Sequence, residues 1–91
     1  MTLSIAGSGA APGDATAVVL NVAATNVAAH SYLTVYPAGE PLPGTSNLNL
    51  VPGQTISNLV ICRLGAGGAL TIANPIGASD AIADVLGYFT A

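Results

Sequence analysis

Turn-forming residues divide this 91-residue chain into short segments, and their spacing limits what the chain can fold into. Clusters of glycine, proline and asparagine recur at intervals of roughly eight to twelve residues, which suits strands better than helices. The segments between them are rich in β-branched and aliphatic residues, which favour pleated structure. The pattern predicts these strands: Thr2–Ala6, Thr16–Thr25, Ser31–Tyr36, Asn47–Leu50, Ile56–Leu64, Ala69–Asn74 and Asp80–Phe89.

About seven short strands with turns between them are typical of an all-β protein. We therefore expect a single antiparallel β-sandwich of Greek-key or jelly-roll type, with no helix. A chain of this length cannot divide into two parts that each bury a core. Residues 1–91 are therefore expected to form one domain.

The segment Ile56–Leu64 is the longest β-branched and aliphatic run in the chain. Such a run indicates a buried strand, so we expect it in the middle of a sheet with a neighbour on each side. Pro52-Gly53 before it predicts a type II turn, and Gly65–Gly68 after it predicts a tight hairpin. Cys62, the only cysteine, has no disulfide partner within the chain and is expected to be a small buried hydrophobe.

Charged residues make up 5% of the chain, against about 25% in an average soluble domain. Arg63 is the only cation and the net charge is −3, which excludes binding to a nucleic-acid backbone. No run of roughly 18 apolar residues occurs, so no membrane insertion is predicted. The N-terminal segment alternates like a strand and lacks the features of a secretory signal. If Met1 is the native start, the chain is expected to stay in the cytosol after synthesis.

Catalytic chemistry is not indicated by the residues present. His30, the only histidine, could in principle form a triad with Ser31 and Asp80. However, no serine sits in a nucleophile elbow, and His30 lies in a turn of small residues, so a surface histidine is expected. We predict no enzyme activity, no catalytic residues and no cofactor.

A metal site needs three or four converging ligands. The carboxylates of this chain are instead spread over loops and one strand: Asp14, Glu40, Asp80 and Asp84. Asp80 and Asp84 share a strand face but lie some 13 Å apart at about 3.3 Å per residue. No metal ligands are therefore predicted.

Asparagine is unusually frequent in the predicted strands, where this residue is generally disfavoured. Because its amide both donates and accepts hydrogen bonds, it can link strands where they diverge. We predict an internal polar network, to which Arg63 could add, of five side chains: Asn21, Asn47, Asn49, Asn58 and Asp84. The alternative is a glycan-binding face on which Tyr32 and Tyr36 stack against sugar rings.

Sheet edges are commonly protected by lysine, and this chain has none. Its edges must therefore be covered by barrel closure, by the proline-rich loop that contains Pro41 and Pro43, or by a neighbouring subunit. A nearly uncharged module is also consistent with a surface that forms interfaces. Both observations indicate an assembly.

Six ordered segments resemble a known domain: Val19–Asn26, Tyr32–Gly39, Ser46–Asn49, Pro52–Thr55, Ser57–Val60 and Ile82–Tyr88. Together they resemble a β-sandwich accessory domain that recurs in secreted and surface proteins of actinobacteria. The resemblance covers nearly the whole chain and implies a non-catalytic accessory or adhesive module. It supplies no ligand residues.

These observations lead to one expected function and one alternative. We expect a bacteriophage virion protein that decorates a capsid or tail, with copies of itself and a larger protein lattice as partners. The alternative is an excised domain of a secreted actinobacterial protein that binds cell-wall polymer or polysaccharide. The first places the chain on the virion surface if Met1 is the native start, and the second places it outside the cell or on the cell surface.

Overall fold

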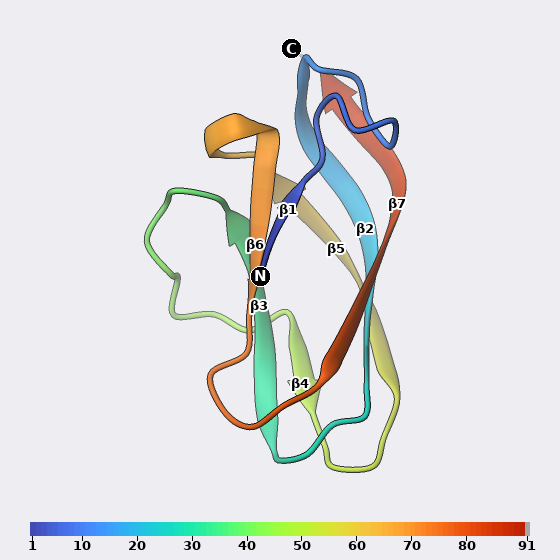
Figure 1. The fold of residues 1–91 in the computed structure, drawn as a ribbon, viewed down its shortest axis with the longest axis vertical. Helices are drawn as coiled ribbons and strands as arrows, with labels where there is room; N and C mark the ends of the chain where they lie inside the picture. Colours follow the sequence, from blue (N-terminus) through green and yellow to red (C-terminus); the bar gives the residue numbers. More distant parts are fainter. Residues whose placement is uncertain (91) are drawn as a thin grey trace.

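The computed structural model describes residues 1–90 as two antiparallel sheets packed into a β-sandwich (Figure 1). A single turn of 3₁₀ helix, η1, covers Ala66–Gly68. The strands are β1 (Thr2–Ser4), β2 (Ala15–Thr25), β3 (Ser31–Pro37), β4 (Leu48–Leu50), β5 (Ile56–Arg63), β6 (Ala69–Ala73) and β7 (Asp80–Thr90). The predicted all-β sandwich is confirmed, and each strand ends within two residues of its expected bounds.

The four-stranded sheet has the order β1-β6-β3-β4, and the three-stranded sheet has the order β5-β2-β7. Five of the six connections cross from one sheet to the other, and β3 and β4 alone are neighbours both in sequence and in a sheet. The hairpin predicted at Gly65–Gly68 is therefore wrong, because β5 and β6 lie in different sheets. Glycine is needed at Gly65 for another reason: a Cβ there would collide with the backbone of Ala38.

The core lies between the sheets, and β2 contributes most to it. Side chains alternate along a strand, and the residues of β2 that point inward are fully buried: Val18, Leu20, Val22 and Ala24. From the opposite sheet, Leu33, Leu50 and Leu70 meet them and are also buried. These four residues alternate with residues that point outward, as expected for a strand with one face in the core.

Strand β5 is an edge strand, so its predicted place in the middle of a sheet is wrong. Its inward residues Val60 and Cys62 are buried, and Cys62 is a free thiol as expected. The alternating residues Leu59 and Ile61 are 58% and 66% exposed. The continuous apolar run therefore reflects a sheet face left uncovered within the monomer, and β2 takes the central position instead.

Two loops show how the connections are fixed. At the predicted type II turn, Gly53 has φ +77°, and the Gln54 N–H donates to the Val51 carbonyl at 3.1 Å, which confirms the turn. The proline-rich loop folds over the outer side of the four-stranded sheet, where the Thr34 hydroxyl donates to the Thr45 carbonyl at 2.6 Å.

Candidate interaction surface

The outward side of the three-stranded sheet is the most unusual surface of the molecule. Because Val18 and Leu20 point into the core, the alternate residues of β2 point away from it, and the strand registers extend this to β5 and β7. We call this surface the outer face. It consists of Ser57, Leu59, Ile61 and Arg63 on β5, Ala17, Val19, Asn21, Ala23 and Thr25 on β2, and Asp80, Ile82, Asp84, Leu86 and Phe89 on β7.

Large apolar side chains dominate the outer face. Five of them are more than half exposed: Leu59 at 58%, Ile61 at 66%, Ile82 at 52%, Leu86 at 63% and Phe89 at 51%. Together they expose on the order of 500 Å², as large as the biggest apolar patch of many whole monomers. The complete described surface measures 4784 Å², so this patch is about a tenth of it. Patches of this kind mark contact sites.

The outer face has a low row of side chains between two raised rows, and all three run along the strands. Its central row, which we call the valley, has mostly small, half-buried side chains: Ala17, Val19, Asn21 and Ala23. Leu59 and Ile61 form the β5 ridge along one side. Ile82, Leu86 and Phe89 form the β7 ridge along the other.

A β-bulge shapes the β7 ridge. Val19 pairs with Gly87, but the next residue, Leu20, pairs with Val85, so Leu86 is an extra residue in β7. A bulge of this kind redirects a side chain and increases the local twist. Leu86 is therefore presented to solvent on the outer face.

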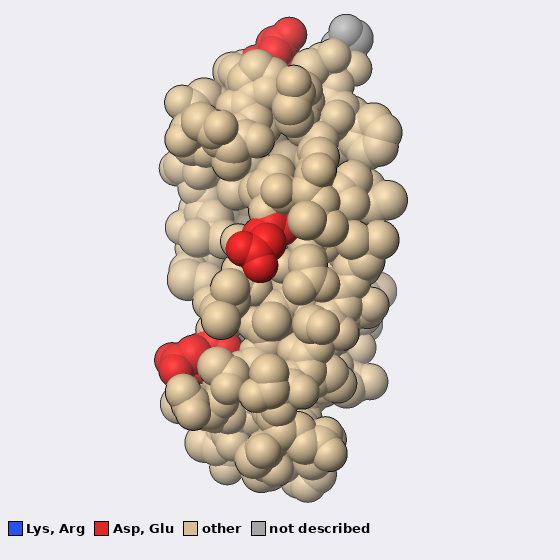
Figure 2. Space-filling view, turned by 90° about the vertical axis from the view of Figure 1, so that its right-hand side faces the viewer, with Lys and Arg blue, Asp and Glu red and all other residues tan. Residues whose placement is uncertain are grey.

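Charge is sparse around this surface. Arg63, at the end of β5, donates to the Glu40 carboxylate at 3.1 Å in an exposed ion pair. Asp80 and Asp84 lie on β7. From the side on which β7 lies, Figure 2 shows isolated carboxylates on a surface that is otherwise uncharged. Weak charge of either sign leaves apolar contact as the main interaction available here.

Two of the predicted network residues are brought together by the structure. The Asn47 side-chain carbonyl accepts from the Val35 N–H at 2.7 Å. The Asn58 amide donates to the Asn47 backbone carbonyl at 2.9 Å, and its own carbonyl accepts from the Leu59 N–H at 3.0 Å. This pair links β5 to the segment before β4, and therefore one sheet to the other.

The remaining network candidates lie elsewhere. The Asn49 side-chain oxygen is exposed and 3.5 Å from the Ser46 hydroxyl. Asn21 and Asp84 face each other across the β2–β7 pairing, on the outer face. A separate polar contact that the sequence did not predict joins the Asn26 amide to the Asp80 carboxylate at 2.7 Å. Sequence spacing could not reveal it, because 54 residues separate the two.

The two tyrosines of the glycan alternative lie on the outer side of the four-stranded sheet. Tyr32 is 39% exposed and Tyr36 is half-buried. Between them, Thr34 is buried beneath Thr45 of the proline-rich loop. At about 3.3 Å per residue the tyrosines are some 13 Å apart along β3, so they do not form one continuous stacking platform.

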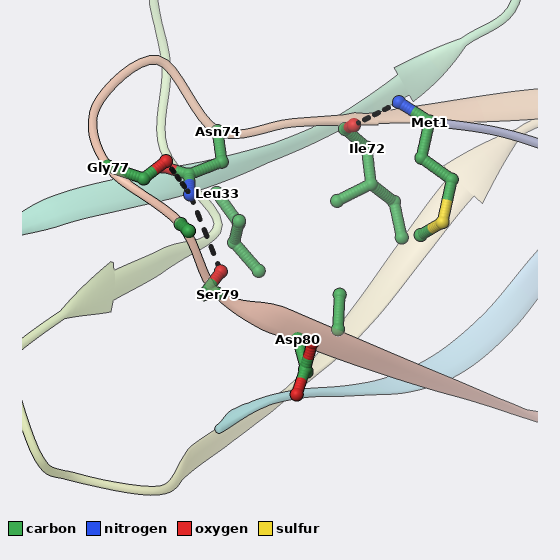
Figure 3. Close-up of a pocket in the computed structure, with 9 residues that line it drawn as sticks. Met1, Leu33, Ile72, Asn74, Gly77, Ser79 and Asp80 are labelled. Carbon is green, nitrogen blue, oxygen red and sulfur yellow. Dashed lines mark hydrogen bonds between the residues drawn. The ribbon is translucent and has the colours of Figure 1, made fainter. Parts of the chain in front are cut away.

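A cleft of about 480 Å³ opens between the sheets where β7 begins (Figure 3). Leu33 and Ile72 line its apolar part, and Asn74 and Ser79 lie toward one end. The Asn74 amide donates at 3.4 Å both to the Gly77 carbonyl and to the Ser79 hydroxyl. These polar groups bond to one another, so they do not converge on the cleft as a recognition site would require.

Two of the candidate catalytic residues are engaged in other contacts, and the third is exposed. The Ser31 hydroxyl donates to the Asn74 side-chain oxygen at 2.7 Å, Asp80 accepts from Asn26, and His30 is exposed. Burial raises the pKa of the Cys62 thiol, although the nearby Arg63 opposes the shift. A buried thiol with a raised pKa is a poor nucleophile.

The structure adds two findings for residues 1–90. His, Cys, Asp and Glu side chains do not gather there in groups of three that could hold a metal ion. Within the same residues, no helix has the length and apolar character needed to cross a membrane.

The sequence analysis did not identify the outer face, although a signal was present. Strands β2, β5 and β7 each carry apolar residues at both alternating positions, as with Val19 beside Val18 and Ile61 beside Val60. Such strands are either covered on both sides or leave one apolar face open. No protein-family model, curated protein or solved structure matches the chain.

Proposed function

We propose that this chain is a non-enzymatic structural module that docks against other protein surfaces, as a decoration protein on a bacteriophage capsid or tail. The observation that carries the proposal is the outer face, where five large apolar side chains are more than half exposed. An apolar surface of this size is stabilised when another protein covers it, because about 25 cal/mol is gained for each Å² of apolar area removed from water.

The sheet edges support the same proposal. Strand β1 and strand β4, at the edges of the four-stranded sheet, have three residues each, whereas β5 has 8 and β7 has 11. Long edges without lysine readily pair with other chains. At the β5 edge the Leu59 N–H is bonded by the side chain of Asn58, which protects one position. A module with such edges suits a crowded, ordered layer of neighbours.

Low charge also fits a layer on a particle. Copies held at high density repel one another when each carries a large net charge. With a net charge of −3 over 91 residues, this repulsion is small. A capsid or tail offers many identical sites, and a compact module of this kind can occupy neighbouring sites together.

The test is recovery with phage particles. Particles from a lysate of a phage that encodes the chain are banded on a density gradient, and the chain is detected by mass spectrometry. We expect the wild type to band with particles. If the chain stays in the soluble fraction and never bands with particles, the proposed function is wrong.

Matched variants in the phage locate the docking contact. Ile61→Asp places a charge on the outer face and is expected to reduce incorporation. Leu42→Asp changes a residue of similar exposure, 57% against 66% for Ile61, that lies in the proline-rich loop, and is expected to leave incorporation unchanged. Equal incorporation of the two variants would exclude the outer face as the docking contact.

A polysaccharide-binding module is the second candidate, and one observation favours it. A shallow hollow of about 290 Å³ beside the exposed ring of Tyr32 is also lined by Gly44, Thr45 and Ser46. An aromatic face beside hydroxyl groups can hold a sugar ring. Retention of the chain on insoluble cell wall, abolished by Tyr32→Ala and not by Tyr36→Ala, would support this function over the virion role.

A further inference from the structure

The strip of the outer face formed by β5 and β2 sets the area of a dimer contact. Strand β5 has 8 residues and pairs with the longer β2, so the strip is about 26 Å long and about 10 Å wide. With side-chain relief included, each copy exposes on the order of 300 Å² of this strip to a partner, which is the size of a weak, reversible contact. We therefore expect exchange between monomer and dimer in place of a permanent dimer.

The relief of the outer face is self-complementary. The valley lies on β2 and the β5 ridge lies on the neighbouring strand, about 4.8 Å away. A two-fold axis that runs along the strands between β5 and β2 exchanges these two features. Each β5 ridge then lies in the valley of the other copy, with Ile61 over the row of Val19 and Leu59 over the row of Asn21. Symmetric dimers use one patch in this way on both subunits.

Charge decides which ridge enters the valley. The β7 ridge is interrupted by Asp84 and begins at Asp80, and burying an unpaired carboxylate is strongly unfavourable. The β5 ridge has no charge until Arg63, whose guanidinium bonds Glu40 at the exposed end. Inserting β5 leaves both aspartates of each copy at the outer margin, in water. In the valley, Asn21 faces Asp84 across the strands and can keep a polar partner.

We propose that the outer face binds the same face of a second copy of this chain, with each β5 ridge seated in the partner's valley. This rests on the proposed function only in treating the outer face as a protein contact. It adds the identity of the partner, the symmetry of the dimer and the side chains at its centre. The particle of the proposed function then takes up dimers, so a change that breaks the dimer also lowers incorporation.

Sedimentation velocity of the full chain, from micromolar to millimolar concentration, tests the proposal. We expect a concentration-dependent equilibrium between monomer and dimer. Ile61→Asp affects the interface twice, once from each copy, and should weaken dimerisation about 100-fold or more. Leu86→Asp, on the marginal β7 ridge, should weaken it less than about 10-fold. Leu42→Asp, outside the face, should change nothing.

Circular dichroism and thermal melting check that each variant is folded, and Ile61→Thr gives a milder, β-branched version of the ridge change. A wild type that remains monomeric at millimolar concentration overturns the proposal. So does a dimer that Ile61→Asp and Ile61→Thr leave intact, or one that Leu86→Asp disrupts as strongly as Ile61→Asp. A monomer that bands with phage particles refutes this dimer and leaves the proposed function standing. A dimer that never bands with particles refutes the proposed function and leaves this dimer standing.

Discussion

Removing the side chain of Asn47 tests the polar link between β3 and β4. The backbone pairing of these strands ends at Leu33 and Leu48, and the Asn47 side chain continues it by accepting from the Val35 N–H at 2.7 Å. Val35 is 8% exposed, so in Asn47→Ala its N–H loses its partner in a place that water reaches poorly. A buried unsatisfied donor costs about 1–3 kcal/mol. For a domain of this size, a loss of about 2 kcal/mol lowers the melting temperature by roughly 10 °C.

Two assays measure this effect. Thermal melting by circular dichroism gives the change in stability, and amide hydrogen exchange reports Val35 itself, which should lose protection in Asn47→Ala. Asn47→Asp keeps an acceptor oxygen and should lose less stability than the alanine variant. Asn49→Ala removes a nearby asparagine that is exposed, and should change stability by less than about 0.5 kcal/mol. A melting temperature for Asn47→Ala within about 2 °C of wild type would refute the reasoning.

Three further predictions concern other parts of the chain. Because burial raises the pKa of Cys62 above its ordinary 9.0, the folded thiol should react slowly with a disulfide reagent near neutral pH. The buried neutral thiol stabilises the folded state at pH values below its ordinary pKa. This stabilisation should be lost as the pH rises above that value, because the thiol of the unfolded chain ionises first. Alkaline denaturation of wild type and Cys62→Ser measures the loss. Gly65→Ala should prevent folding or lower the melting temperature strongly, because its Cβ meets the Ala38 backbone, whereas Gly13→Ala has open space and should melt like wild type. His30→Ala should leave stability and association unchanged, because the side chain is exposed.

The strands were predictable because their information is local. In β2, the run of β-branched and aliphatic residues between turn residues specifies the strand, and the two-residue period places Val18, Leu20 and Val22 on one side of it. The type II turn at Pro52-Gly53 was predictable for the same reason. Proline fixes one backbone angle and glycine permits the positive φ that follows it.

The arrangement of the strands was not predictable in this way. A glycine-rich turn such as Gly65–Gly68 has the same local chemistry whether it joins two paired strands or crosses between sheets. Which strand lies beside which depends on contacts between distant residues, as in the pairing of β1 with β6. An apolar run such as that of β5 therefore suggested a central strand, although the structure places it at an edge.

The candidate site shows the same division. Among the asparagines predicted to make polar links, Asn58 donates to the Asn47 backbone across the sandwich, and the Asn47 side chain bonds β3. For Asn21 and Asp84 the residue types gave no indication that they would lie on an exposed apolar face. That surface exists because three strands with apolar residues on both sides leave one side without a covering layer.

The most direct test of the central claim, that a second copy packs on the β5 and β2 rows of the outer face, is an isotope-filtered NOE experiment. The sample mixes equal amounts of labelled and unlabelled chain at millimolar concentration. The account predicts intermolecular NOEs from the Ile61 methyl groups of one copy to Val19 and its neighbours in the valley of the other. Intermolecular NOEs confined to other surfaces, or none at all, would contradict it.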